Sequence, residues 1–193
     1  MSKRFLVLSA CLFFFTCFTA SAQSFMHSIG ATPTLLFGKD EFSNSYQIFQ
    51  TNITYFPRYN FVENENSSID IGAPLGIGFG IANSTYGDPA FLFAYDHPAV
   101  VDYNIGCKST PDNDNTFGGY VGAGFGYYHV SVSGSSYSDF KGGTYGPIAR
   151  AGVRIGSEKE SWRGHALTIG FYYKKGLEDA KLTTVGCNVL VDF

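Results

Sequence analysis

The sequence alternates between apolar residues and small or polar residues over long stretches. The clearest stretch is 69–81, where the odd positions carry apolar side chains and the even positions carry Asp, Pro and Gly. Residues 117–128 repeat the pattern, with apolar side chains at most odd positions and mainly glycine at the even ones. Successive side chains of a β-strand point to opposite faces, so this period of two predicts strands with one apolar face and one small or polar face.

The same period predicts eight strands after residue 22, and no helical period persists between them. The expected strands are 27–37, 45–56, 67–81, 90–107, 116–132, 143–155, 164–175 and 182–193. Turn-forming or charged residues are common in the connections, which are 38–41, 60–66, 83–89, 110–115, 133–141, 156–163 and 176–181. Four prolines fall inside expected strands, namely Pro33, Pro74, Pro98 and Pro147. Proline cannot donate a ladder hydrogen bond, so we expect each at a bulge, a strand end or a bend.

The small face decides which side of the strands lies inside. A soluble sheet would cover its water-exposed face with Lys, Glu, Thr and Ser, whereas the middle positions of this face are repeatedly glycine, which weakens a strand. Glycine fits the interior of an eight-stranded barrel, which is just wide enough for side chains to fill. The predicted fold class is therefore all-β, an eight-stranded antiparallel up-and-down transmembrane β-barrel whose apolar odd positions face lipid.

Long polar side chains share the small face with the glycines. Those expected to form an ion-pair network in the lumen are Asp70, Asp102, Arg150, Arg154 and Asp192. A buried charge is costly unless it is paired, so acids and bases on one inner face predict mutual neutralisation across the barrel axis. Because strand direction alternates, we expect Asp70, Arg154 and Asp192 near the end that carries the chain termini, and Asp102 and Arg150 one layer further in. This network should close the lumen to ions.

The first 22 residues have the features of an export signal. Two basic residues precede an apolar run over residues 5–18, and small residues stand at Ala20 and Ala22. A membrane-spanning helix needs ~20 apolar residues, so we expect a signal peptide cleaved after Ala22 and one barrel domain over residues 23–193. Cleavage leaves 11 basic and 16 acidic residues, a net charge of −5. Without a basic stripe, nucleic acid is not an expected partner.

The last expected strand alternates to its end and finishes on an aromatic residue, Phe193. With the export signal and the alternation, the chain over residues 23–193 resembles the small eight-stranded outer-membrane β-barrels of Gram-negative bacteria, of the OmpA or OmpX membrane-domain type. The resemblance implies that Phe193, Val191 and Val189 form an assembly signal, which the outer-membrane insertion machinery reads as an exposed strand edge. It also implies a monomer with both termini in the periplasm, in contact with outer-membrane lipid and lipopolysaccharide.

Candidate catalytic chemistry is limited to one pair of residues. His129 and Ser131 share the outward face of an expected strand, which is similar to the His-x-Ser pair of outer-membrane lipid A deacylases. A nucleophile needs a base that a third group orients, and the adjacent expected strand offers no outward carboxylate. The four histidines lie on different strands without ligand spacing. We therefore expect no metal site, no cofactor and no enzymatic activity.

The expected function is a structural or surface-interaction role rather than that of an open pore. The connections that would face outward are 38–44, 82–89, 133–142 and 176–181. They are short, so a receptor or adhesin role would use a small tip around Tyr86 and Tyr137. The main alternative is a soluble periplasmic lipocalin-like barrel that binds an apolar ligand, and a lipid A deacylase-like enzyme is the second.

The two cysteines after residue 22 are expected to be unpaired. Cys107 and Cys187 both occupy odd, lipid-facing positions, on the fourth and eighth of the expected strands. These strands lie on opposite sides of an eight-stranded ring, beyond the ~7 Å that a disulfide can bridge between Cα atoms.

Overall fold

The computed structural model describes residues 23–39, 45–83, 89–134, 137–157, 164–177 and 182–193. All regular secondary structure in these ranges is β-strand. The described residues contain no helix that is long and apolar enough to span a membrane. The strands are β1 Ser24–Lys39, β2 Ser45–Asn64, β3 Ser67–Gly72, β4 Leu75–Asn83, β5 Pro89–Gly106, β6 Phe117–Gly134, β7 Tyr137–Gly156, β8 Ala166–Lys175 and β9 Thr183–Asp192. The expected signal peptide, residues 1–22, lies outside the described residues.

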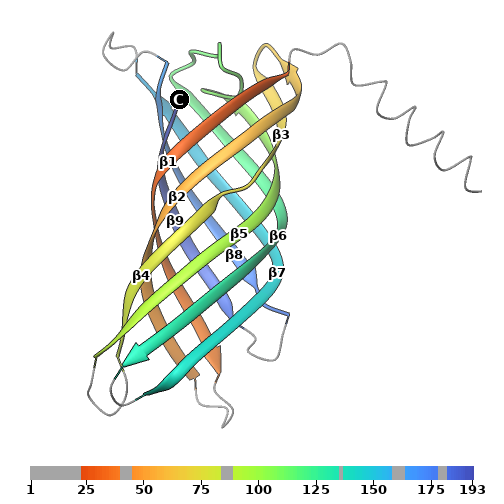
Figure 1. The fold of residues 1–193 in the computed structure, drawn as a ribbon. Helices are drawn as coiled ribbons and strands as arrows, with labels where there is room; N and C mark the ends of the chain where they lie inside the picture. Colours follow the sequence, from red (N-terminus) through yellow and green to blue (C-terminus); the bar gives the residue numbers. More distant parts are fainter. Residues whose placement is uncertain (1–22, 40–44, 84–88, 135–136, 158–163, 178–181) are drawn as a thin grey trace, which may run out of the picture.

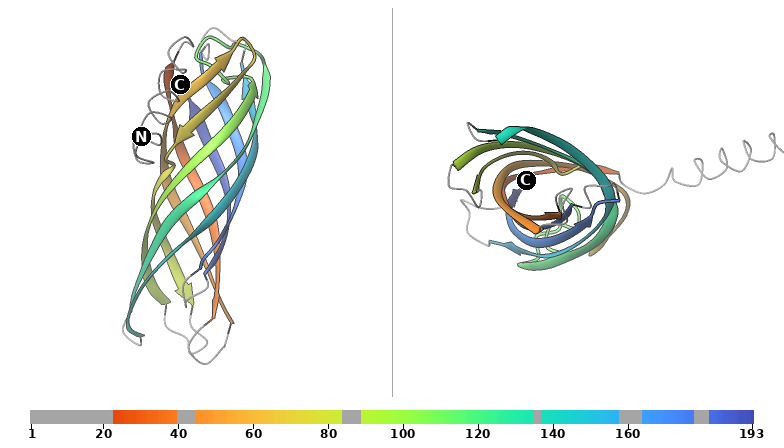
Figure 2. Two further views of the ribbon diagram at one scale, coloured as in Figure 1. Left: turned by 90° about the vertical axis from the view of Figure 1, so that its right-hand side faces the viewer. Right: turned by 90° about the horizontal axis from the view of Figure 1, so that it is seen from below.

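The strands close into an antiparallel ring of eight positions, because β3 and β4 together occupy the one position between β2 and β5 (Figure 1). β1 pairs with both β2 and β9, which closes the ring around the lumen (Figure 2). Ala149 on β7 pairs directly with Ala123 on β6. A path that leaves Ala149 in the other direction, from paired residue to paired residue around the ring, returns to β6 at Ser133. The two positions on β6 are ten residues apart. This stagger accompanies the strand tilt of a closed barrel. The predicted fold class is confirmed.

The expected strand 67–81 is interrupted at residues 73–74, between β3 and β4. Pro74 lies in this break, and Pro98 faces it from β5, between the residues that pair with β3 and those that pair with β4. Pro33 lies where the ladder between β1 and β9 is interrupted. Pro147 immediately precedes the first residue of β7 that pairs with β8. All four prolines therefore lie at ladder interruptions, where the missing N–H is tolerated.

Two expected connections are wrong. β2 continues to Asn64, so the connection expected over 60–66 is reduced to a turn at Glu65 and Asn66. Most of the connection expected over 133–141 belongs to β6 and β7. In both segments, residues that favour turns are held in the ladder by pairing with neighbouring strands.

Side-chain orientation follows the predicted parity. All buried strand side chains have even numbers and face the lumen. Large apolar side chains at odd positions are exposed, among them Ile53 (62%), Phe171 (64%) and Phe117 (72%). An exposed apolar belt on this scale is the surface that a barrel presents to lipid.

Candidate functional site

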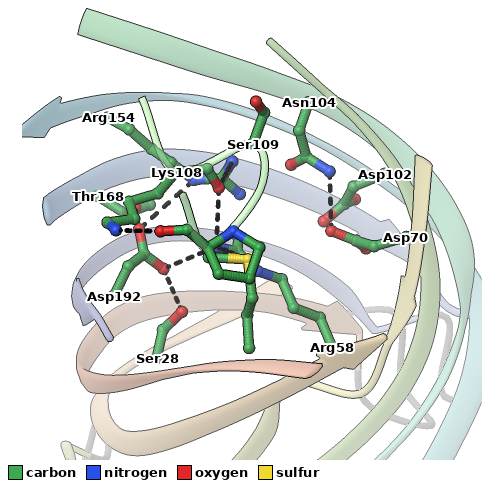
Figure 3. Close-up of polar contacts among 12 residues, drawn as sticks. Ser28, Arg58, Asp70, Asp102, Asn104, Lys108, Ser109, Arg154, Thr168 and Asp192 are labelled. Atoms are coloured by element: carbon green, nitrogen blue, oxygen red, sulfur yellow. Dashed lines mark hydrogen bonds and ion pairs between the residues drawn. The ribbon is translucent and has the colours of Figure 1, made fainter. Parts of the chain in front are cut away.

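Asp192 lies at the centre of a charged layer inside the terminal end of the barrel, the end at which β1 begins and β9 ends (Figure 3). Its carboxylate accepts hydrogen bonds from the hydroxyl groups of Ser28 and Thr168. It also forms ion pairs with Arg58 at 3.5 Å and with Arg154 at 3.4 Å. All five residues are buried. Two arginines therefore share one carboxylate.

The connection between β5 and β6 enters the lumen at this layer and supplies further acceptors. The backbone carbonyl of Lys108 accepts hydrogen bonds from Arg58 at 3.2 Å and from Arg154 at 3.3 Å. The carbonyl of Ser109 accepts a hydrogen bond from the Asn60 side chain at 3.0 Å. The inserted backbone thus accepts one hydrogen bond from each arginine, in addition to the ion pairs with Asp192.

The chain turns into the lumen at Gly106 and Lys108, whose φ angles of 71° and 52° lie in the left-handed region. Cys107, expected on the lipid face, is instead buried with 1% of its surface exposed. That expectation is wrong because β5 ends at Gly106 and the strand parity does not continue into the turn. Burial raises the pKa of the Cys107 thiol. Cys107 and Cys187 are both free cysteines, as expected.

A further ion pair joins Asp102 on β5 to Arg150 on β7, with Oδ2 and Nε 3.6 Å apart. The Arg150 guanidinium also lies 4.5 Å from the ring centroid of Phe56 and 4.7 Å from that of Tyr120. Neither carboxylate oxygen of Asp102 accepts a hydrogen bond from a described residue. Arg150 is therefore the described residue that neutralises the buried Asp102 carboxylate.

Asp70 is placed differently from the expected arrangement. It lies directly opposite Asp102 in the ladder between β3 and β5 and accepts a hydrogen bond from Asn104 at 2.8 Å (Figure 3). It forms no salt bridge with any described residue, whereas the sequence placed it beside Arg154 and Asp192. Of the five expected network residues, the structure thus brings four into two ion pairs, and Asp70 lies next to one of them.

A fourth buried ion pair, which the sequence analysis did not assign, lies nearer the opposite end. Lys174 Nζ is 2.6 Å from Asp96 Oδ1 and lies 4.9 Å from the ring centroid of Tyr128. The Tyr128 hydroxyl donates a hydrogen bond to Gln50 at 2.7 Å. Apolar side chains then occupy the lumen beside Tyr128, and this outer apolar cluster comprises Leu36, Ile48, Leu92, Ala94, Tyr128, Val130 and Leu182.

A small cavity lies between the Arg150 and Lys174 layers. Its volume is about 20 Å³, and Thr32, Asn52, Asp96 and Arg150 are among its lining residues. A water molecule needs ~10–15 Å³ of such space, so the cavity suits one or two waters and is too small for an apolar ligand.

Arg58 and Lys108 are parts of the charged layer that the sequence analysis missed. Arg58 has the inward parity of its neighbours on β2, but the strand was expected to end at residue 56. If the alternation of inward and outward positions had been continued for two residues past residue 56, it would have placed Arg58 in the lumen. Lys108 lies in a connection, where no periodic signal marks insertion into the lumen.

The carboxyl end completes the ladder that closes the ring. The Phe193 amide donates a hydrogen bond to the His27 carbonyl at 3.0 Å, the His27 amide donates one to the Phe193 carbonyl at 3.3 Å, and the two rings lie 5.2 Å apart. Val191 and Val189 pair with β1 on the same outward face. The role of these residues as an assembly signal stays a prediction.

His129 and Ser131 lie on the outward face of β6. The His129 ring stacks on Tyr95 at 4.8 Å, and its Nδ1 is 3.5 Å from the Tyr127 hydroxyl. Ser131 pairs with Phe93 on β5 and with Lys141 on β7. Two tyrosines thus contact His129, and its described contacts include no carboxylate that could orient it as a base.

No protein-family model and no curated protein matches the sequence. Solved structures match along almost the whole chain. Neisserial surface protein A (NspA) aligns with a TM-score of 0.58 and 15% identity, over 89% of this chain and 98% of that one. Ail, the attachment invasion locus protein of Yersinia pestis, aligns with a TM-score of 0.53 and 13% identity, over 90% of this chain and 99% of that one. A second Ail structure, in complex with the heparin analogue sucrose octasulfate, aligns with a TM-score of 0.52 and 13% identity, over 90% of this chain and 99% of that one.

The fold is that of the small outer-membrane β-barrels of Gram-negative bacteria. Together with the exposed apolar belt, this fold places the protein in the outer membrane.

Proposed function

We propose that the protein is an outer-membrane barrel with a structural or surface-interaction role, that its lumen is closed to ions, and that it is neither an enzyme nor an open pore. Its terminal end would face the periplasm after removal of a signal peptide at Ala22. The observation that carries the proposal is the succession of side-chain layers across the lumen. It begins with the Arg58 and Arg154 layer, continues through the Arg150 and Lys174 ion pairs, and ends in the outer apolar cluster.

A conducting path needs connected water, and the lumen offers little room for it. The cavity of about 20 Å³ is bounded by Arg150 on one side and Asp96 on the other, and both side chains are held in ion pairs. Apolar constrictions such as the outer apolar cluster resist wetting. A hydrated ion would have to break buried ion pairs and hydrate an apolar segment, so we expect little or no conductance.

The expected partners follow from this placement. The apolar belt would contact membrane lipid and lipopolysaccharide, and the edge that ends at Phe193 would be read by the insertion machinery during assembly of a monomer. Of the expected outer tip, Tyr86 lies outside the described residues and the Tyr137 side chain is not described. Surface interaction through the loops is therefore proposed without a ligand.

Planar-bilayer recording tests the closed lumen. Purified, folded protein should give no stable channels in bilayers in which an open porin conducts. Folding is verified by the shift in gel mobility that heating causes in detergent. Stable, large single-channel conductance from the wild type would overturn the proposal and make the protein a porin. Recovery of the native protein in the soluble periplasmic fraction would instead favour the soluble barrel.

A further inference from the structure

Two carboxyl groups lie next to each other in the lumen, and we name Asp70 and Asp102 the carboxyl pair. Asp70 on β3 and Asp102 on β5 are direct partners in the ladder, and both are 0% exposed (Figure 3). Directly opposed residues have Cβ atoms ~4.5–5.5 Å apart, so the two carboxyl groups can reach each other. Two negative charges at this separation, away from water, repel each other strongly.

The surroundings of the carboxyl pair are short of hydrogen-bond donors. Asp70 Oδ2 accepts a hydrogen bond from Asn104 at 2.8 Å. Asp70 Oδ1 and both oxygens of Asp102 accept none from a described residue, and neither do the amide oxygens of Asn104 and Asn60. Asn60 is the ladder partner of Asp70 on β2, and all four residues are at most 1% exposed. Buried acceptors are normally satisfied, so these unpartnered oxygen atoms on three adjacent strands point to a missing donor.

The arginines of the lumen are already paired with other groups. Arg150 forms its ion pair with Asp102. Arg58 and Arg154 share the carboxylate of Asp192, and the Lys108 carbonyl accepts a further hydrogen bond from each of them. The charges of Arg58 and Arg154 also act on Asp70, but each acts less strongly than the charge of Asp102. Asp70 therefore lacks a cation of its own among the described residues.

The other polar groups on the neighbouring elements do not supply one. Lys108 Nζ donates a hydrogen bond to a backbone carbonyl of its own turn at 2.7 Å and lies 3.9 Å from Asp114. Glu63 on β2 adds a further negative charge, and it accepts a hydrogen bond from Asn60 at 2.8 Å. From β6, the Tyr120 ring lies against the guanidinium groups of both β7 arginines.

A metal ion would fit poorly beside the carboxyl pair. A methyl group at Gly122 would lie 1.8 Å from Asp102 Oδ1, so this oxygen packs against the backbone of β6. The lining of the lumen cavity includes neither Asp70 nor Asp102. Calcium takes ~6–8 oxygen ligands, and the Arg150 guanidinium beside Asp102 would repel it. A proton needs no such space.

We propose that the carboxyl pair binds one proton in the folded barrel, held on Asp70 Oδ1 and donated to Asp102 in a hydrogen bond. This proton turns an unpartnered acceptor into a donor, removes the repulsion between the carboxylates and leaves Asp102 charged beside Arg150. In the unfolded chain both side chains are hydrated and release their protons above pH ~4. The folded barrel then holds a proton that the unfolded chain has lost, so its stability falls as rising pH removes that proton.

Urea titration of the protein folded in lipid vesicles, between pH ~5 and ~9, tests this linkage. The unfolding equilibrium constant of the wild type should rise by up to ~tenfold for each pH unit over which the pair loses its proton. Asp70→Asn removes the titrating group, while its amide can still accept the hydrogen bond from Asn104 and donate one to Asp102. This variant should lack the rise and be more stable than the wild type at the alkaline end. The matched control Asp114→Asn removes a carboxylate that is 61% exposed and should keep the rise.

Infrared spectroscopy of the same samples provides a second readout. The wild type and Asp114→Asn should show the carbonyl band of a protonated carboxyl group, and Asp70→Asn should lose it. Asp70→Ser, whose hydroxyl can also donate to Asp102, replaces Asp70→Asn if that variant does not fold.

Three results would overturn the inference. The first is an equal pH dependence in the wild type and the Asp70 variant, and the second is an infrared band that survives removal of Asp70. The third is stabilisation by added calcium that the wild type shows and the Asp70 variant lacks, because this would identify a metal site. Bilayer conductance tests the closed lumen separately, so failure of the proton site can be told from failure of the proposed function.

Discussion

The two ion-paired arginines of the expected network should differ in what their removal costs. Arg150→Met leaves Asp102, which is 0% exposed, without its ion-pair partner, and no described residue donates a hydrogen bond to either oxygen. Leaving a buried charge unpaired costs ~3–5 kcal/mol, and the contacts with Phe56 and Tyr120 are lost as well. We expect the free energy of unfolding to fall by at least ~3 kcal/mol.

Arg154→Met provides the matched comparison. Asp192 would keep its ion pair with Arg58 and the hydrogen bonds from Ser28 and Thr168. The loss should therefore be closer to that of one hydrogen bond to a charged group, ~1.5–3 kcal/mol. The structure thus predicts that Arg150 matters more than Arg154, although both are buried arginines on β7.

Urea titration of the protein folded in lipid vesicles measures both losses, with the folded fraction read from the heat-modifiable band on unheated gels. The double variant Arg150→Met/Asp102→Asn removes the stranded charge and should recover much of the stability of the wild type. If Arg150→Met unfolds at the same urea concentration as Arg154→Met, or if the double variant is no more stable than Arg150→Met, the assignment of Asp102 to Arg150 is refuted.

Three further predictions concern other parts of the barrel. Deletion of Phe193 should reduce the amount of protein that reaches the outer membrane more than it lowers stability, because one side chain contributes at most ~1.5–3 kcal/mol; wild-type levels in a fractionation assay would contradict this. In the folded protein Cys107 should resist maleimide, since burial keeps its thiol protonated and covered, whereas Cys187 should react with a lipid-soluble maleimide; mass spectrometry of the labelled site decides. Gly122→Ala should cost ~1–3 kcal/mol, because its methyl group would lie 1.8 Å from a lumen carboxylate oxygen, whereas Gly76→Ala, with 3.5 Å to its nearest atom, should cost less in the same urea titration.

The strands were predictable because their pattern is long and each face has a distinct chemistry. The break at residues 73–74 was not, since the odd positions keep their apolar character across it and the parity gives no sign of an interruption. At Cys107 the alternation was continued one residue past the end of β5, and it wrongly predicted a lipid-facing side chain. Periodicity thus reports which way a side chain faces, but not where the ladder stops.

The candidate site was predictable to the extent that it lies on strands. Asp102, Arg150, Arg154 and Asp192 were placed in the lumen from parity alone, and the structure pairs them. The contribution of Lys108 could not be foreseen, because its carbonyl, and not its side chain, accepts the hydrogen bonds from the arginines. A backbone acceptor carries no signal in the residue type, and its position depends on the three-dimensional path of the turn.

The glycines of the small face gain a specific explanation from the register. Gly122 on β6 pairs with Asp102 on one side and with Arg150 on the other, so the acid and the base are two strands apart and must meet above the glycine. A side chain at position 122 would occupy the space that an Asp102 oxygen fills. Gly118 lies opposite Arg154, and a methyl group there would come within 2.4 Å of the Cys107 backbone nitrogen, where the chain turns into the lumen. Because an eight-stranded lumen has so little room, each long charged side chain needs small residues beside it, and the arginine-to-acid pairing and the glycine pattern are two consequences of the same packing constraint.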